Sequence, residues 1–464
     1  MEDDLSVLTA DEEGRILDRL AALEQIIQMA AIHQALRAFP APYRERRCVL
    51  TREVMLWVVL AMGILTHLPI RQVFKACRRL RPGEPTPHRS SLCVARQRLG
   101  IGPVRHLFEH TVRLLATPQT PGSFYKGLRL MAMDGSVFLV PDSDANAAAF
   151  GRPHGGRGDG AFPQVRKLSL VEVGTHVEVA FALKGIRETD SAEQRMAPAL
   201  LRHLRPGMLL VWDRGFFSYS LWQQAVATGA QVLARVKSSL VLRPVRSLSD
   251  GSYLANLYPC QSFRNRNQGG LLVRVIRYTL NDPRRVGHGQ EHVLISTLLD
   301  AEAYPAKELI LLYHERWEIE LVYDEQKTHQ TPRRASKTAH LRSETPQGVI
   351  QEMYALSLGH FVVRAVMAEA ARQENLDPDR LSFVGCLQIL QCRLPEYAGC
   401  GLPLEQWYQG LLEEMRQEQI EPRRNRVNPR VVKIKMSKFR KKRPEHRGIK
   451  PLTHHFLETI VMVA

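Results

Sequence analysis

Residues 128–140 read LRLMAMDGSVFLV, and here the pattern of the chain changes from helices to strands. The runs at 128–133 and 137–140 are mostly apolar, and each has the length of one strand. Asp134 follows the first run directly. The stretch therefore predicts two strands, with Asp134 at the end of the first.

Further strands alternate with helices on the C-terminal side of this stretch. Strands are expected at residues 168–173, 177–183, 208–212 and 231–236, and helices at 192–204 and 218–227. Three of the four candidate strands before the first helix would make an antiparallel run, so the predicted order is β-β-β-α-β-α-β. Such an order is typical of an α/β domain built on a sheet.

A second aspartate, Asp213, follows the strand at 208–212 as Asp134 follows its own strand. If these two strands are neighbours in a mixed sheet, both carboxylates lie at one edge of it. Two hard oxygen ligands close together suit magnesium or manganese. Aspartate is also common in ordinary turns, so this pattern by itself leaves the choice open.

The region between residues 237 and 290 is rich in turn-forming residues and predicts a β-rich insertion around a strand at 271–278. A strand at 293–298 then resumes the sheet. Pro305 opens a helix that is expected to run to Lys327. Further helices are expected at 347–369 and 404–420.

Four polar side chains share one face of the helix that begins at Pro305. At about 100° per residue, they fall within an arc of roughly 60°; they are Tyr313, Arg316, Glu320 and Lys327. Leu312, Ile319 and Val322 fall mostly on the other side, which predicts that they pack on the sheet while the polar stripe faces outward. The alternative is a solvated face with an ordinary pair of charges four residues apart.

The side chains of this stripe are of the kinds that phosphodiester chemistry needs. Glu320 supplies a third carboxylate for a pair of metal ions roughly 4 Å apart, which activate the attacking oxygen and stabilise the leaving one. Arg316 offers a planar fork to a phosphate, Lys327 a point charge and Tyr313 a hydroxyl donor.

These motifs resemble those of a known family. Tyr313, Arg316, Glu320 and Lys327 have the spacing of the Y-R-E-K signature of the insertion sequence 4 family of bacterial DDE transposases. The stretches that begin at Asp134 and at Asp213 are similar to the two aspartate motifs of that family. A weaker similarity to its N-terminal region lies at residues 90–100. The order of strands and helices also resembles the ribonuclease-H-like core of these enzymes.

The resemblance implies a DNA transposase that cleaves transposon ends and transfers the strands into target DNA. It implies that Asp134, Asp213 and Glu320 are catalytic and hold two Mg²⁺ (or Mn²⁺) ions. It also implies a dimer assembled on DNA. Trp317 lies either near the transposon end, stacked on an unpaired base, or in the core. Two alternatives stay open at this point: a DNA-binding protein that has lost catalysis, and a ribonuclease-H-like nuclease without strand transfer.

The expected fold is α/β: a ribonuclease-H-like mixed-sheet catalytic core with a β-rich insertion, flanked by helical N- and C-terminal regions. The expected domains are a helical DNA-binding domain at 1–125, the first part of the core at 126–236, the insertion at 237–290, the second part of the core with the glutamate helix at 291–370, and a helical and basic region at 371–464.

The helical N-terminal part includes a helix capped by Thr51 and a basic helix capped by Ser90. A third helix between them is expected at 73–80. Two of these helices around a turn suit either a helix-turn-helix reader of DNA or an ordinary helical bundle. The basic segment at 423–450 suits either a phosphate-contacting arm or a solvated tail.

The composition agrees with a nucleic-acid partner. Lys and Arg number 64 against 47 Asp and Glu, for a net charge of +17 and a pI near 9.8, and such an excess favours a polyanion. The apolar run at 54–65 is too short to cross a bilayer, and the first residues are acidic where a secretory signal is basic. The seven cysteines contain no C-x-x-C pair. We therefore expect a bacterial cytoplasmic protein without a membrane partner, associated with the nucleoid when it is bound to DNA.

Overall fold

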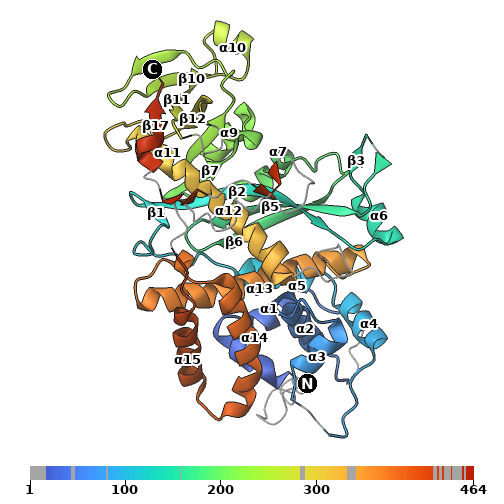
Figure 1. Ribbon diagram of the computed structural model, residues 1–464. Coiled ribbons are helices and arrows are strands. Elements are labelled where there is room, and N and C mark those ends of the chain that lie inside the picture. Colours follow the sequence, from blue (N-terminus) through green and yellow to red (C-terminus); the bar gives the residue numbers. More distant parts are fainter. Residues whose placement is uncertain are drawn as a thin grey trace. The chain divides into compact units, whose positions relative to one another are not determined.

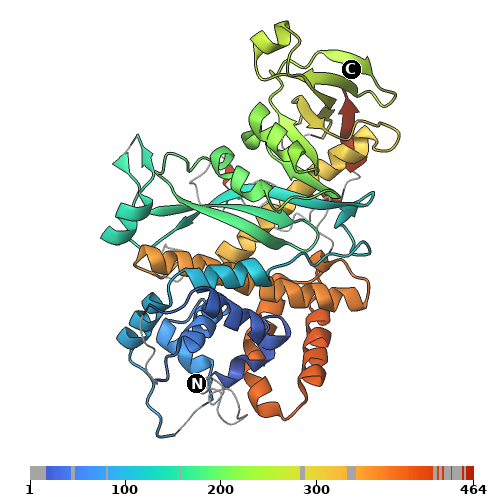
Figure 2. The same ribbon diagram turned by 180° about the vertical axis from the view of Figure 1, so that it is seen from behind.

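A computed structural model describes the chain in Figures 1 and 2. The described residues are 17–42, 48–79, 82–156, 158–282, 288–331, 341–421, 426–427, 431–432, 440–441, 452–453 and 456–463. They divide into two compact units. Unit 1 consists of Met1–Phe124, Asp134–Met196 and Glu318–Ile420, and unit 2 of Tyr125–Met133, Ala197–Trp317 and Glu421–Ala464. The predicted basic segment at 423–450 lies almost entirely outside the described residues.

Most of unit 1 is a helical bundle in which N-terminal and C-terminal helices pack side by side (Figures 1 and 2). Its helices are η2 (Asp18–Gln25), α1 (Met29–Ala38), α2 (Arg52–Ile64), α3 (Ile70–Ala76), α4 (Arg89–Leu99), α5 (Gly102–Thr111), α13 (Pro346–Gln373), α14 (Phe383–Cys400) and α15 (Leu404–Gln417). The buried helices α2 and α13 cross so closely that a Cβ at Gly63 would lie 1.8 Å from the Ala355 carbonyl oxygen. A glycine is required there because only it lets the two backbones touch.

The predicted N-terminal helices are present, with two corrections. Thr51 caps α2 as predicted, because its hydroxyl accepts a hydrogen bond from the Val54 amide. The basic helix α4 is instead capped by His88, whose ring accepts from the amide of Ser90, so the Ser90 cap was wrong. Helix α3 begins at Ile70 and ends at Ala76, earlier than the 73–80 predicted.

Helix α14 was not predicted at all, and it fills much of the C-terminal part of the bundle. Pro395 and two glycines, Gly385 and Gly399, interrupt its sequence pattern, and such residues ordinarily mark helix ends. The helix forms because Leu387, Leu390 and Leu394 are buried in the bundle. Tertiary packing therefore outweighs the low local propensity.

The sheet strands of unit 1 are the C-terminal half of β2 (Leu128–Leu139), β5 (Gln164–Glu172) and β6 (Val177–Gly185), in the order β6-β5-β2. Strands β5 and β6 are an antiparallel hairpin. The prediction of two separate strands around Asp134 was wrong, because β2 is continuous and Asp134 lies within it. Gly135 does not make a turn; a Cβ there would lie 2.2 Å from Oε1 of Glu193, so close approach is the reason for this glycine.

Unit 2 is built on the sheet order β2-β7-β8-β12-β11-β10-β9. These strands are β7 (Met208–Trp212), β8 (Gln231–Val236), β9 (Pro244–Ser247), β10 (Tyr253–Leu257), β11 (Leu271–Leu280) and β12 (His292–Ser296). The first half of β2 pairs in parallel with β7, so the two strands that precede the aspartates are neighbours, and β12 returns beside β8. The predicted insertion extends this same sheet, since β11 pairs with β12 and β10 with β11.

The remaining helices differ from the prediction in smaller ways. The helix predicted at 192–204 is two short ones, α7 (Glu193–Met196) and α8 (Pro198–Leu201), since Pro198 cannot continue the first. Helix α9 (Tyr219–Ala227) is capped by Ser218. Further short elements are α6 (Asp144–Phe150), α10 (Gln261–Asn265) and β17 (Ile460–Met462), which pairs with β11. No helix among the described residues is long and apolar enough to cross a membrane.

The predicted glutamate helix is present but is not one regular α-helix. It consists of α11 (Ala306–His314), a 3₁₀ turn η4 (Glu315–Trp317), α12 (Glu318–Asp324) and a π-helical segment η5 (Glu325–Gln330). Departures from α geometry of this kind commonly mark functional segments. The even spacing of 100° per residue that underlies the predicted stripe therefore does not hold along its length.

Candidate active site

Asp134 and Asp213 directly follow the last paired residues of the parallel strands β2 and β7. The register of β2 and β7 ends with the pair Met133 and Trp212, and each of these residues is followed directly by one aspartate. Both aspartates are half-buried. The backbone amide of Gly135 donates to Oδ1 of Asp134 at 2.8 Å, which fixes the carboxylate beside the strand.

Asp213 is held by two neutral donors in unit 2. Its Oδ1 accepts hydrogen bonds from the backbone amide of Arg214 at 2.6 Å and from the hydroxyl of Tyr313 at 3.1 Å. It also caps a 3₁₀ turn, η3 (Arg214–Phe216). Burial, together with the nearby Asp213 carboxylate, raises the pKa of Tyr313 above its usual value, so this hydroxyl stays protonated and acts as a donor. Tyr313 is thus joined directly to one predicted metal ligand.

Glu320 is exposed on α12, and its helix is bonded to the strand of Asp134 within unit 1. The hydroxyl of Tyr323, one turn after Glu320, donates to the backbone carbonyl of Asp134 at 2.7 Å. The prediction from the sequence missed Tyr323, since a tyrosine among apolar residues gives no sign of its partner. Its hydrogen bond fixes the register of α12 against β2.

Lys327 also reaches β2. Its Nζ donates to the hydroxyl of Ser136 at 3.0 Å and lies 5.3 Å from the ring centroid of Phe138. Ser136 is two residues after Asp134, so the lysine charge is fixed beside the first aspartate motif. Lys327 lies in the π-helical segment η5.

The prediction that the polar stripe faces outward was wrong for two members and right for Glu320. Tyr313 and Arg316 are only 5% and 6% exposed, because the 3₁₀ turn η4 breaks the even rotation of the helix. Trp317 is 40% exposed, with the Arg316 guanidinium 5.3 Å from its ring centroid. The interpretation of Trp317 as a core residue is therefore wrong. Leu312, Ile319 and Val322 are buried as predicted.

The prediction from the sequence also missed a set of buried charged residues around α12. We call it the buried charge cluster; its members are His176, Glu318, Glu325, His360, Arg364 and Asp379, all in unit 1. Oε2 of Glu325 accepts from Nε of Arg364 at 3.0 Å and lies 2.8 Å from Nε2 of His360. One signal was available, since Glu318 and Glu325 are seven residues apart on the side of the buried Ile319 and Val322.

Two family models match the chain. One, described as the N-terminal part of insertion element 4 transposases, matches residues 17–109. The other, described as the transposase DDE domain, matches residues 125–356. The chain belongs to the insertion sequence 4 family of DDE transposases. This transposase therefore has the ribonuclease-H-like fold of that family, and the sheet and helices of the structure agree with it.

Two relatives from Escherichia coli agree with the family. The transposase InsG for insertion sequence element IS4 of Escherichia coli (strain K12) is 29% identical over 402 residues, which cover 85% of this chain and 88% of that protein. A putative transposase of the same organism, InsZ, is 25% identical over 185 residues, which cover 39% of this chain and 58% of that protein. Among solved structures, a piggyBac transposase synaptic complex with hairpin DNA aligns with a TM-score of 0.43 at 12% identity, covering 86% of this chain and 85% of that one.

The transposase is thus an enzyme that acts on DNA and uses divalent metal ions. The predicted ligands fit a hard cation, because Asp134, Asp213 and Glu320 offer only carboxylate oxygens, the donors that Mg²⁺ and Mn²⁺ prefer. The two hydrogen bonds given above for Asp213 come from uncharged donors. Neither of these donors neutralises the carboxylate, so its negative charge stays available to a cation.

Proposed function

We propose that Asp134, Asp213 and Glu320 are the catalytic carboxylates and hold two Mg²⁺ (or Mn²⁺) ions, at which transposon ends are cleaved and joined to target DNA. In such a site the ions activate the attacking oxygen and stabilise the leaving one. The protein's own part is to keep three carboxylates at fixed positions. The proposal concerns the residues and the number of ions; the transposase activity itself follows from the family.

The observation that carries this assignment is the pair of tyrosine hydrogen bonds from one helix to both aspartates. Tyr313 donates to the Asp213 carboxylate, and Tyr323 donates to the Asp134 carbonyl. Glu320 lies between these two tyrosines in the chain. The same helix is therefore bonded to each aspartate motif, and this supports a common role for the three carboxylates.

The other signature residues are proposed to hold DNA. Lys327 exchanges its hydrogen bond to Ser136 for a phosphate oxygen beside the first aspartate. Arg316 supports the exposed Trp317 ring, which offers a surface for an unpaired base at the transposon end. Tyr313 orients Asp213 through its hydroxyl. We further propose that the partners are transposon ends and target DNA, that the enzyme works as a dimer assembled on DNA, and that DNA binding associates it with the nucleoid.

We also propose a role for each predicted domain. The helical region at 1–125 and the basic region at 371–464 are proposed to bind DNA around the split core at 126–236 and 291–370. The insertion at 237–290 is proposed to serve that core. Limited proteolysis with and without transposon-end DNA tests these boundaries, which predict protection of the outer regions by DNA.

The decisive experiment replaces each carboxylate by its amide: Asp134→Asn, Asp213→Asn and Glu320→Gln. Each variant loses metal charge but no phosphate contact, so cleavage should fall on the order of a thousandfold or more. Gel shifts on the cognate end should stay close to those of the unchanged protein. Glu405→Gln, an exposed glutamate of α15, is the matched control and should cleave normally. A variant that still cleaves removes its residue from the site.

A strand-transfer assay on the unchanged protein then distinguishes the other interpretations. A transposase joins the cleaved 3′ end to target DNA. Cleavage without joining would identify a nuclease, and specific binding without either step would identify a DNA-binding protein that has lost catalysis.

A further inference from the structure

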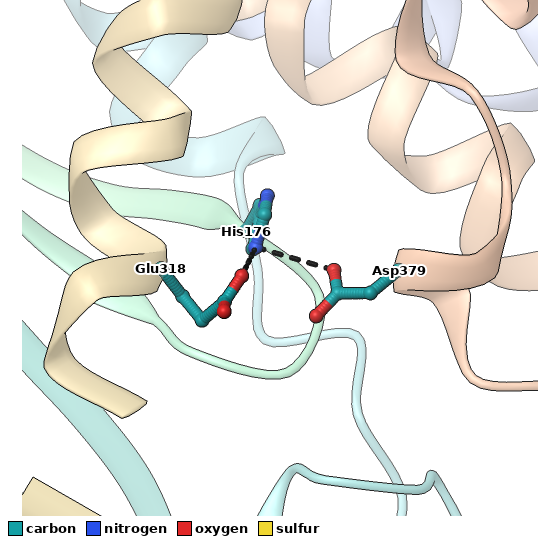
Figure 3. Close-up of side chains that lie close together, drawn as sticks. All are labelled: His176, Glu318 and Asp379. Carbon is teal, nitrogen blue, oxygen red and sulfur yellow. Dashed lines mark hydrogen bonds and ion pairs between the residues drawn. The ribbon is translucent and has the colours of Figure 1, made fainter. Parts of the chain in front are cut away.

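Three side chains of the buried charge cluster converge on one point in unit 1 (Figure 3). Nε2 of His176 lies 3.0 Å from Oε2 of Glu318 and 3.2 Å from Oδ1 of Asp379. They come from three separate places: the turn between β5 and β6, the start of α12, and the 3₁₀ turn η6 (Pro378–Arg380). All three side chains are buried, and His176 is not exposed at all.

The number of protons on His176 does not match its number of carboxylate neighbours. A ring nitrogen carries at most one hydrogen, so Nε2 can donate one good hydrogen bond. Two carboxylate oxygens, those of Glu318 and Asp379, nevertheless converge on Nε2. A cation placed between the nitrogen and the two oxygens would contact all three atoms. The convergence is therefore that of a ligand set, more than that of a hydrogen-bonded histidine.

The other ring nitrogen has the support that metal-binding histidines need. Nδ1 lies 3.2 Å from Oε1 of Glu325, and a carboxylate on the far nitrogen is the usual partner that orients a ligand histidine and sets its tautomer. Arg364 approaches both Nδ1 and Glu325 and forms a buried ion pair with this carboxylate. Glu325 is thereby held beside the ring.

His176 is also kept in an uncommon backbone conformation. Its φ is 58°, in the left-handed region that residues other than glycine seldom adopt. Such a conformation persists only where the surroundings require it, and it is frequent at ligand-binding positions. Here it turns the imidazole toward α12 and η6 (Figure 3).

Within the cluster, carboxylates outnumber the side chains that carry a positive charge. Glu318, Glu325 and Asp379 are three carboxylates, and Arg364 supplies one positive charge. Burial lowers the pKa of His360, so this ring adds no charge at neutral pH. Charges buried this close to one another are costly unless they are paired, so a divalent cation among the carboxylates would be stabilising.

We propose that His176, Glu318 and Asp379 bind one Zn²⁺ ion in a site separate from the catalytic carboxylates. Zinc suits one imidazole and two carboxylates, whereas Mg²⁺ and Ca²⁺ favour oxygen ligands alone. Ligands about 2.1 Å from a tetrahedral ion are roughly 3.4 Å apart. The distances of 3.0 and 3.2 Å in this structure are close to that value, so little movement is needed to admit the ion.

The site connects the glutamate helix to the rest of unit 1. Glu318 is two residues before Glu320, which is roughly 200° around the helix and therefore on the opposite side. The ion would clamp the buried side of α12 to the β5–β6 turn and to η6. It thus positions the helix that bears Glu320 and takes no part in the reaction. The proposal does not depend on the assignment of the catalytic residues.

The test is the metal content of the full-length protein, purified without added zinc and exchanged into a magnesium buffer. Elemental analysis should find about one zinc ion per chain. His176→Gln and Asp379→Asn should each reduce zinc to background. His33→Gln is the matched control, because His33 also faces a glutamate, Glu53, at 3.3 Å but near the surface; it should keep the zinc. Glu320→Gln should keep it too, which distinguishes this site from the catalytic one.

The proposal is overturned if the folded, unchanged protein holds no zinc after equilibrium dialysis against micromolar Zn²⁺. It is also overturned if folded His176→Gln keeps the full zinc content. Should both variants fail to fold, the unchanged protein is loaded with Co²⁺ in place of zinc. A visible absorption spectrum of tetrahedral cobalt with nitrogen and oxygen ligands supports the site, and a spectrum of hydrated cobalt alone rejects it.

Discussion

Glu320 and Glu318 are two positions apart on α12, yet their surroundings differ completely. Glu320 is exposed, on the side proposed to meet metal ions and DNA. Glu318 is 8% exposed and faces His176 in the buried charge cluster. Water reaches the first carboxylate, whereas the second needs counter-charges within the protein. The two side chains are chemically identical, so burial and charge compensation decide the role of each glutamate.

Removing a counter-charge from the buried side should have the largest effect on stability. Arg364→Ala leaves the buried Glu325 carboxylate without its guanidinium. We expect a loss of about 3–5 kcal/mol in the free energy of unfolding, as is usual when one partner of a buried ion pair is removed. Urea denaturation monitored by circular dichroism measures it.

Arg393→Ala is the control for that experiment. Arg393 pairs with Glu414 and Glu396 at the surface, with its side chain 41% exposed, so its loss should cost much less than the loss of Arg364. Equal costs for the two arginines would contradict the contrast between buried and exposed charges.

The basic segment at 423–450 offers a test of DNA binding on a larger scale. Replacing Lys433, Lys435, Lys438, Lys441 and Lys442 by glutamine should flatten the plot of log affinity against log salt by about 0.9 for each lost phosphate contact. Cognate and unrelated DNA should be affected alike, because phosphate contacts carry no sequence information. Substitution is preferable to truncation, since β17 follows the segment and pairs with β11. An unchanged slope would show that the segment does not lie along DNA.

Arg316→Ala and Lys327→Ala should act at a later stage. Both residues lie on the helix of Glu320, where DNA reaches them only when its end is at the carboxylates. We expect binding of the cleaved end to weaken by about tenfold or more, the size of one or two lost charge-assisted hydrogen bonds. Binding to intact DNA should change less. Competition gel shifts with the two DNA forms measure the difference, and equal losses would favour a helix that contacts no DNA end.

Tyr323→Phe should have the smallest effect on the free energy of unfolding. It tests whether the hydrogen bond from Tyr323 positions α12, and with it Glu320, against β2. It removes the hydroxyl that donates to the Asp134 carbonyl but keeps the buried ring. The free energy of unfolding should fall by about 1 kcal/mol, the net value of one hydrogen bond. Cleavage should fall by more than this loss explains, because Glu320 loses its register against β2. Glu325 keeps its hydrogen bond to Arg364, so the circular dichroism spectrum of the folded protein should be preserved.

Much of the fold was predictable because it depends on local patterns. Strands β7 and β8 were predicted with the bounds that the structure has, and β12 within two residues, since short apolar runs between turns define strands. Helix α14 was missed because Pro395 suggests an end that tertiary packing overrides. The continuity of β2 through Asp134 was missed because an Asp-Gly pair is typical of a turn. The domain boundaries stay a prediction.

The sequence by itself determined which residues carry the chemistry: three carboxylates after strands and on one helix, with Arg316 and Lys327 at a fixed spacing from Glu320. Motifs of this kind are readable because each depends on residue type and separation along the chain. Only the tertiary structure decided which of the neighbouring charges is buried. Glu318, Glu325 and Arg364 look like ordinary surface charges in the sequence. Their burial depends on β5, β6, α12 and α13 meeting in space, and the free energy of a charge depends on that environment.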